Sequence, residues 1–159
     1  MTAQACMRPR RLAELFTDTP IYYLTICTHK RQHLLNNHSV HEPFRAFAVR
    51  ADTYGVTVGR YVLMPDHVYL FAAFSANAVS LPSWVKSLKN SLSKCLRQQG
   101  IPSPHFQKDY FDHVLRSTES LQEKSEYMFL NPVRAGLVER PEDWEFQGEI
   151  FRLENALED

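Results

Sequence analysis

The chain has 159 residues, of which 44% are hydrophobic and 23% charged, a composition that indicates one soluble globular domain with a full core. This composition argues against a disordered protein, and because no apolar run is as long as a membrane span, we expect no membrane partner. The formal net charge is zero at pH 7, which taken alone argues against a nucleic-acid partner.

The charges are, however, unevenly distributed along the chain. Residues 1–116 hold 14 Lys and Arg against 7 Asp and Glu, whereas residues 117–159 hold 4 against 11. This asymmetry is compatible with a basic binding face, and equally with a patchwork of solvated charges. We therefore expect a single domain over 1–159, with a basic arm over 1–19 and an acidic closing segment over 139–159. The cations of the arm are Arg8, Arg10 and Arg11.

The three cysteines, at positions 6, 27 and 95, are widely spaced and form no CxxC pair. A disulfide framework or a cysteine-based zinc site is therefore not expected. The first residues, MTAQACMRPRR, lack the apolar region of a signal peptide. Both observations favour a reducing cytoplasm.

The first half of the chain predicts a strand, a helix and a second strand. Residues 21–28, IYYLTICT, are β-branched and aromatic and are typical of a strand. A basic loop, HKRQHLL, follows with Lys30 and Arg31. Residues 41–54 carry apolar side chains at spacings of three and four, which predicts a helix that ends at Gly55. Residues 56–63 then predict the second strand.

A third strand follows the Pro65-Asp66 turn and places two polar rings together. In the run HVYLFAAF, His67 and Tyr69 are two residues apart, so they project from the same face of the strand. Val68 and Leu70 fall on the opposite face, as expected for a sheet buried against helices. The paired rings are compatible with a metal site, and equally with a satisfied polar residue beside a half-buried aromatic one.

Residues 81–99 predict an amphipathic helix whose polar side is entirely basic. Its apolar side chains fall on one arc at 100° per residue, and the segment contains no acidic residue. A solvated helix face normally mixes both signs of charge, so a purely basic face favours phosphate binding. The cations are Lys86, Lys89, Lys94 and Arg97. Residues 101–110 predict a loop.

Residues 117–130 predict the last helix, with a capping box at Ser120 and Glu123 and an end at Pro132. Glu123, Tyr127 and Asn131 follow one another at intervals of four, so they line one side of this helix. The order strand, helix, strand, strand, helix, helix predicts an α+β fold of the ferredoxin-like or RRM-like kind. Its antiparallel sheet would carry helices on one face and an additional helix with Tyr127.

Several stretches together resemble one family, the single-tyrosine HUH transposases of small insertion sequences, and within it the REP-associated tyrosine transposases. The matching stretches span residues 20 to 147 and are TICTHKRQHLL, MPDHVYLF, FQKDYFDHVLRSTESLQ and EYMFLNPVRAGLV. The resemblance implies a single-stranded DNA transposase that recognises a DNA hairpin, acting as a monomer or a homodimer.

The resemblance also implies roles for individual residues. In the family, two histidines that flank a hydrophobic residue bind a divalent metal, and a later tyrosine attacks a phosphodiester to give a 5′-phosphotyrosine and a free 3′-hydroxyl. By motif match, Tyr127 is the nucleophile, and His67 and Asn131 bind Mg²⁺ or Mn²⁺. The expected DNA contacts are Arg8, Arg10, Arg11, Lys30, Arg31, Lys86, Lys89, Lys94 and Arg97.

The sequence departs from the family pattern at Tyr69, which stands where the second histidine is expected. A neutral imidazole is a ready ligand near pH 7, whereas a phenol with a pKa of about 10 is mostly protonated there. Hard divalent ions do accept oxygen ligands, so Tyr69 remains a candidate third ligand. The alternative is weakened chemistry or a non-catalytic DNA-binding protein on the same fold.

Other candidates from the sequence are weaker. Tyr110 is a rival nucleophile, but no ligand lies one turn away from it. An RRM-like RNA-binding protein would require exposed aromatic side chains on neighbouring strands, and Tyr69 is the main candidate. Four histidines have spacings compatible with zinc but lie in or beside a loop, which argues against a site there. They are His29, His33, His38 and His41.

Overall fold

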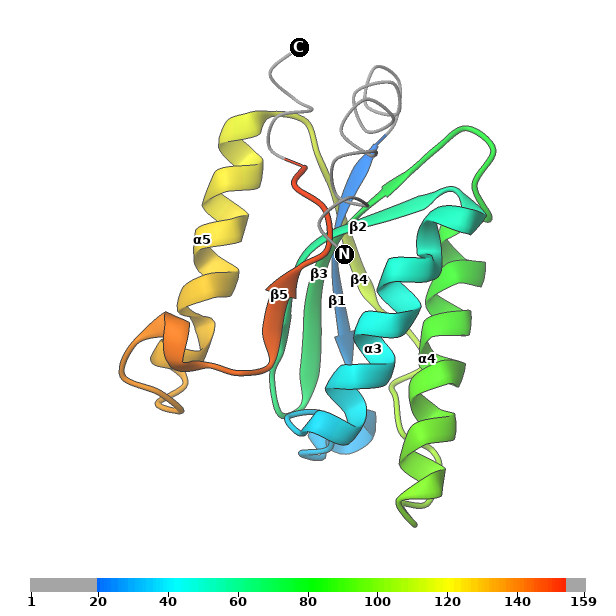
Figure 1. Cartoon of the computed structure of the whole chain (residues 1–159), viewed down its shortest axis with the longest axis vertical. Coiled ribbons are helices and arrows are strands. Elements are labelled where there is room, and N and C mark those ends of the chain that lie inside the picture. The colour runs from blue at the N-terminus through cyan, green and yellow to red at the C-terminus, as the bar shows by residue number, and fades with distance from the viewer. Residues whose placement is uncertain (1–19, 154–159) are drawn as a thin grey trace.

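The computed structural model describes residues 20–153, so the arm with Arg8, Arg10 and Arg11 and the last six residues lie outside the described part. The elements in chain order are β1 (Ile21–Cys27), η1 (His29–Arg31), α3 (His38–Arg50), η2 (Ala51–Tyr54), β2 (Val56–Leu63), β3 (His67–Phe74), α4 (Leu81–Gln98), β4 (Phe111–Leu115), α5 (Thr118–Arg134), η3 (Pro141–Asp143) and β5 (Gln147–Glu149) (Figure 1). No helix in residues 20–153 is long and apolar enough to cross a membrane.

Five strands form one antiparallel sheet in the order β4-β1-β3-β2-β5. The sheet confirms the predicted α+β class, with β3 at its centre between β1 and β2. Two strands, β4 and β5, were not predicted. β4 is an edge strand whose first three residues are exposed, and β5 has only three residues, so neither carries the apolar alternation by which strands are recognised.

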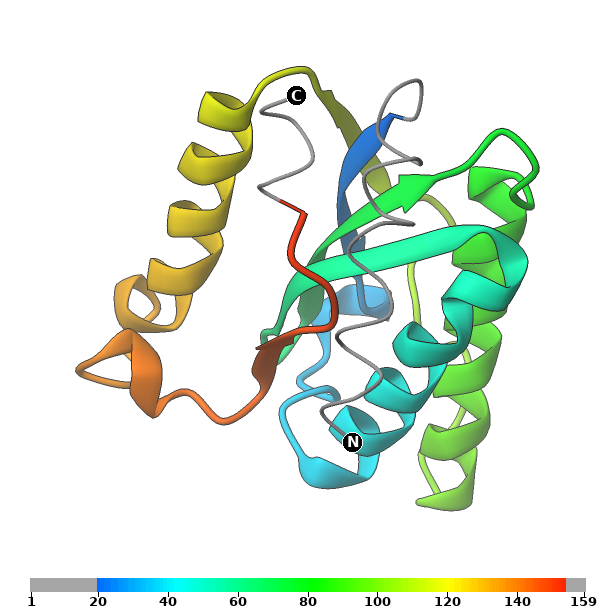
Figure 2. The same cartoon turned by 45° about the horizontal axis from the view of Figure 1, so that its top comes forward.

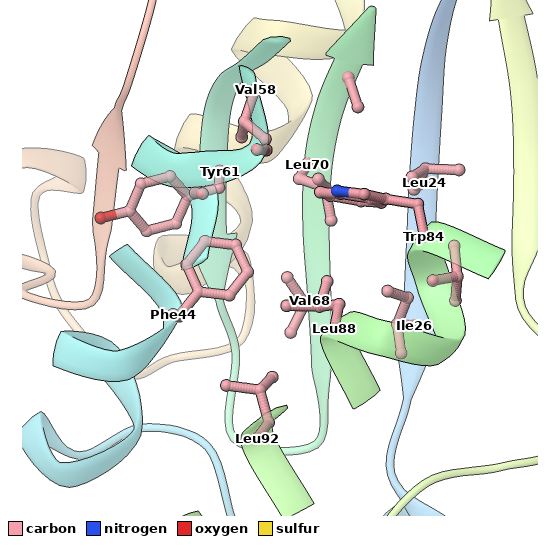
Figure 3. Packing of buried hydrophobic residues seen from close by; sticks show 14 of the residues in the cluster. Leu24, Ile26, Phe44, Val58, Tyr61, Val68, Leu70, Trp84, Leu88 and Leu92 are labelled. Carbon is pink, nitrogen blue, oxygen red and sulfur yellow. The ribbon is translucent and has the colours of Figure 1, made fainter. Parts of the chain in front are cut away.

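One face of the sheet is covered by α3 and α4, which lie side by side (Figures 1 and 2). The main core fills the space between these helices and the sheet (Figure 3). Leu70 of β3, Phe44 of α3 and Leu88 of α4 meet there, each with no more than 1% of its surface exposed. This arrangement follows from sequence, because the even-numbered residues of β3 and the apolar arc of α4 are the sides that must leave water.

The opposite face is covered by α5 and the segment that follows it, as the turned view makes visible (Figure 2). Leu121 and Met128 of α5 pack with Phe71 of β3 and with Trp144. The indole Nε1 of Trp144 donates a hydrogen bond of 3.1 Å to the carbonyl of Leu63. The helix with Tyr127 is thus held against the odd-numbered side of β3, which is the side that carries His67 and Tyr69.

The helix ends differ from prediction at four points. α3 begins at His38 rather than 41, because the Asn37 side chain accepts a hydrogen bond of 3.1 Å from the Val40 amide and caps it. The cap of α5 is Ser117, which accepts from the Ser120 amide, so the capping box predicted at Ser120 is wrong. Pro132 does not end α5, which continues to Arg134. α3 ends at Arg50 rather than at Gly55; it is the following 3-10 helix η2 that ends at Gly55, whose φ of 80° favours glycine.

Truncation of Leu70 to alanine should lower the free energy of unfolding by about 2–5 kcal/mol, since it opens a cavity where the central strand meets both helices. Urea denaturation measures the change. The matched control is Val49→Ala on the outer side of α3, where the side chain is 45% exposed and the expected change stays within about 0.5 kcal/mol. Equal effects of the two substitutions would contradict this account of the core.

Candidate active site between β3 and α5

His67 is the first residue of β3 and is nearly buried, with 9% of its surface exposed. Its Nδ1 lies 2.7 Å from the carboxylate Oδ1 of Asp66, and its Nε2 lies 3.4 Å from the amide Nδ2 of Asn131 on α5. A carboxylate can only accept, so Nδ1 carries the proton and Nε2 presents its lone pair to α5. A carboxylate on the far nitrogen is the usual support of a metal-binding histidine.

The charge state of His67 is set by two opposing effects. Burial lowers the pKa of the imidazole, while the Asp66 carboxylate raises it, and the net direction is downward. Asp66 is itself kept ionised: burial raises the pKa of its carboxyl, but hydrogen bonds from Arg31 and His67 outweigh that effect and lower it. The imidazole is therefore neutral near pH 7, which is the form that binds a metal.

Arg31, for which the sequence predicts a DNA contact, is also engaged at this site. Its Nε donates a hydrogen bond of 2.9 Å to Oδ2 of Asp66, and its Nη1 lies 3.3 Å from the Cys27 sulfur. Half of the Arg31 side chain remains exposed, so the guanidinium both braces the Asp66–His67 pair and reaches the surface. The neighbouring Lys30 is exposed and, like Arg31, has a positive φ.

Tyr127 and Asn131 lie one turn apart on α5, and both are available from the side that faces β3. Tyr127 is 48% exposed, whereas Asn131 is partly buried against His67. Glu123, one turn before Tyr127, is exposed. The structure thus brings His67 of β3 to the side of α5 that carries Tyr127 and Asn131, as the shared helix face of these two residues and the face of His67 allowed.

Tyr110 lies on the other side of the sheet. Its ring packs against the core under α3 and α4, with the ammonium of Lys89 5.8 Å from its centroid. This placement separates Tyr110, the rival nucleophile predicted from sequence, from His67.

Tyr69 lies between His67 and Tyr127. Its ring centroid is 4.7 Å from that of His67, 6.2 Å from that of Tyr127 and 5.7 Å from that of Tyr23. Burial, and next the neighbouring Tyr127, raise the pKa of the Tyr69 phenol above its usual value. Tyr69 therefore remains protonated at neutral pH, and it shares the face of His67 as predicted, but as a neutral phenol.

Sequence reasoning missed Arg134, whose guanidinium carbon lies 4.0 Å from the centroid of the Tyr127 ring. Its Nη2 also donates to the backbone carbonyl of Tyr127. Arg134 is seven residues after Tyr127, two turns along the same side of α5. The spacing was readable in the sequence, but the helix was expected to end at Pro132. Asp66 was also missed, although it directly precedes His67.

The basic side of α4 lies away from this site, because α4 and α5 cover opposite faces of the sheet. Lys86, Lys94 and Arg97 are exposed there. Lys89 is different: its ammonium donates to the backbone carbonyls of residues 107, 108 and 109 at 2.8, 3.2 and 3.3 Å. Lys89 thus holds the segment before β4 in place.

No group of three or more His, Cys, Asp and Glu side chains within residues 20–153 could hold a metal ion. The donors at the site are the imidazole of His67 and the amide of Asn131, with the Tyr69 phenol beside them. The histidines of the basic loop form no zinc cluster in this part of the chain. His41 is instead buried, with its Nε2 2.7 Å from the hydroxyl of Tyr61.

A family model described as "Transposase IS200 like" matches residues 18–127, a range that runs from β1 to Tyr127. The chain belongs to the IS200-like transposase family. This assignment confirms the family resemblance of the sequence motifs and places the chain in a family of DNA-processing enzymes.

Two relatives and one solved structure agree with the family. A Haemophilus influenzae protein described as a candidate REP-associated tyrosine transposase is 23% identical over 141 residues, covering 82% of this chain and 80% of that protein. The REP-associated tyrosine transposase of Escherichia coli K12 is 22% identical over 89 residues, covering 56% and 52%. The structure of a REP-associated tyrosine transposase bound to a REP hairpin has a similar fold, with a TM-score of 0.66 at 20% identity over 80% of this chain and 75% of that one.

The imidazole of His67 should titrate below its usual value of about 6.5, and Asp66→Asn should lower its pKa further by removing the carboxylate that favours the charged form. NMR of the ring protons against pH measures both, with His67→Gln identifying the resonance. A pKa that rises in Asp66→Asn would contradict the described pairing.

Replacing Lys86 and Lys94 together by alanine should weaken binding to different DNA sequences alike and flatten its salt dependence by roughly one slope unit per lost phosphate contact. Binding titrations over a range of salt concentrations test this. Arg50→Ala, an exposed cation at the end of α3, serves as the control. Lys89→Ala should instead destabilise the 107–109 segment. An unchanged slope in the double variant would mean that the α4 cations are merely solvated.

Proposed function

We propose that this protein cleaves and rejoins single-stranded DNA beside a hairpin, with Tyr127 as the nucleophile and a divalent ion bound at His67 and Asn131. The contact between His67 and Asn131, 3.4 Å across from β3 to α5, is the observation that carries the proposal, because it places a neutral imidazole one helical turn from an exposed tyrosine. Membership of a transposase family and the fold shared with a protein bound to a REP hairpin support it.

The donor set fits a hard divalent ion with part of its shell supplied by water and substrate. His67 offers an unprotonated Nε2, its other nitrogen is fixed by Asp66, and the Asn131 side chain can present its carbonyl oxygen after a half-turn of the amide. Mg²⁺ and Mn²⁺ suit such mixed oxygen and imidazole ligands. When bound, the ion would supply positive charge for the phosphoryl oxygens and orient the phosphate.

The protein's own residues account for the rest of the reaction. The Tyr127 oxygen attacks phosphorus and loses its proton, a bond forms between them, and the bond from phosphorus to the 3′ oxygen breaks. That oxygen takes up a proton and leaves as a 3′-hydroxyl, while the 5′ end stays on Tyr127 as an ester that a second strand can attack. Arg134, stacked on the Tyr127 ring, places a fixed positive charge beside the forming ester.

Tyr127→Phe should abolish a covalent protein–DNA adduct while leaving hairpin binding nearly unchanged, since only the attacking oxygen is removed. The assay incubates the protein with a pool of DNA hairpins of mixed sequence that carry unpaired extensions, plus Mn²⁺, and looks for a shifted protein band on a denaturing gel. Tyr110→Phe is the matched control and should retain the adduct. An adduct that survives in Tyr127→Phe and disappears in Tyr110→Phe would reverse the assignment.

Tyr69→His should raise cleavage at limiting Mn²⁺ by at least about tenfold, because it replaces a protonated phenol by an imidazole on the same face as His67. The gain should shrink as Mn²⁺ approaches saturation, since part of it is metal affinity. Initial rates of adduct formation against metal concentration test this. If Tyr69→His changes neither rate nor metal affinity, a metal titration of the wild-type protein decides the reason. Tight metal binding would mean that Tyr69 already serves as a metal ligand. No metal binding would favour a non-catalytic DNA-binding protein.

A further inference from the structure

A hollow of about 410 Å³ opens beside Tyr127, between α5 and the outer strands β1 and β4. Its floor is formed by Tyr23 and Thr25 of β1, its outer rim by Phe111 of β4, and its roof by Lys124 and Tyr127 of α5. None of the roles assigned above uses the β4 side of this hollow. It lies on the same face of the sheet as His67, so whatever occupies it is adjacent to the candidate nucleophile.

The strand register arranges three of these side chains in a row across the sheet. Thr25 is paired with Phe111 on one side and with Tyr69 on the other. Residues paired across antiparallel strands project from the same face, so the row runs from the exposed edge of the sheet inward to the site. An extended chain that lies along this row passes from Phe111 to Tyr69, beneath Tyr127.

Phe111 is the feature that packing does not explain. It is 68% exposed on an edge strand, although it borders a hollow of about 410 Å³. Two of its neighbours, Asp112 and His113, are also exposed. An exposed aromatic ring at the rim of a polar-walled hollow is typical of a surface on which a nucleic-acid base stacks.

The side chains around the hollow indicate how a nucleotide would be oriented in it. Lys124 is the cation at its α5 side, with its ammonium 5.6 Å from the centroid of the Tyr23 ring. His113, paired with Tyr23, lines the β4 side of the hollow, whereas Asp112 is paired with Leu24 and projects from the opposite face of the sheet. A nucleotide would therefore sit with its phosphate towards Lys124 and its base over Phe111.

We propose that this hollow binds one unpaired nucleotide of the DNA strand, next to the phosphodiester that Tyr127 attacks. Its base stacks on Phe111 and its phosphate pairs with Lys124. The inference rests on the proposed function, because it takes Tyr127 to act on single-stranded DNA. It adds to that function a place where the protein itself, rather than the hairpin, holds the strand that is cut.

The test uses the full chain in EDTA, so that no cleavage interferes, and the pool of mixed-sequence hairpins with unpaired extensions. In matched pools, 2-aminopurine replaces one extension position at a time. Stacking should quench its fluorescence at one position in the wild-type protein. Phe111→Ala should abolish that quench and weaken binding of extended hairpins by about 5- to 100-fold. Phe111→Tyr should keep both, and hairpins trimmed to the blunt stem should bind wild type and Phe111→Ala equally.

Tyr54→Ala is the matched control, because Tyr54 is an exposed aromatic residue of η2, at the end of α3, which covers the other face of the sheet; it should change neither readout. The subsite proposal fails alone if the wild-type protein binds the extended hairpins and forms the Tyr127 adduct with Mn²⁺, but Phe111→Ala quenches 2-aminopurine fluorescence and binds these hairpins as wild type does. In that case the proposed function stands. If the wild-type protein neither binds the hairpins nor forms the adduct, the proposed function fails and the subsite fails with it.

Discussion

The alternation of side chains along β3 is the constraint on which the rest of the molecule depends. Every second residue of this central strand is buried under α3 and α4, and the residues between them face α5. Because the period of a strand is two, the face that carries His67 and Tyr69 is fixed as soon as Val68 and Leu70 enter the main core. A shift of one residue would exchange the two sets. The free energy of burying the core thus also fixes the orientation of the histidine.

The position of α5 depends on a second, smaller core. Leu121 and Met128 hold the helix to the sheet through contacts with Phe71 and Trp144, and the contact between Asn131 and His67 is made at the edge of this cluster. The site therefore joins two elements that are far apart in sequence and whose spacing is set by apolar side chains. Trp144 supplies none of the candidate reacting groups, but substitutions there bear on the geometry at Tyr127 through this packing.

The sequence predicted what periodicity encodes and missed what depends on tertiary contact. The helix over 81–99 and the shared face of His67 and Tyr69 follow from spacing alone, and the structure has both. The edge strand β4 escaped prediction because FDHVL is mostly exposed and is paired only on the β1 side. The predicted end of α5 is too early because a proline normally ends a helix. In the structure, α5 contains Pro132 and continues to Arg134. The sequence predicts Lys89 as a free cation, but its ammonium donates hydrogen bonds to the backbone carbonyls of residues 107, 108 and 109, a tertiary contact that helix periodicity does not encode.

The separation of the α4 cations from Tyr127 by the thickness of the sheet limits the kind of DNA that can contact both. One edge of the sheet is β4 and the other is β5, and α4 and α5 lie on opposite sides of the plane between them. A polymer in contact with Lys86 and Tyr127 together has to turn around a strand edge within a few nanometres. Duplex DNA has a persistence length of about 50 nm and resists so sharp a turn, whereas an unpaired strand makes it readily. The layering of the fold therefore favours a flexible strand over a stiff duplex for contact with both surfaces at once.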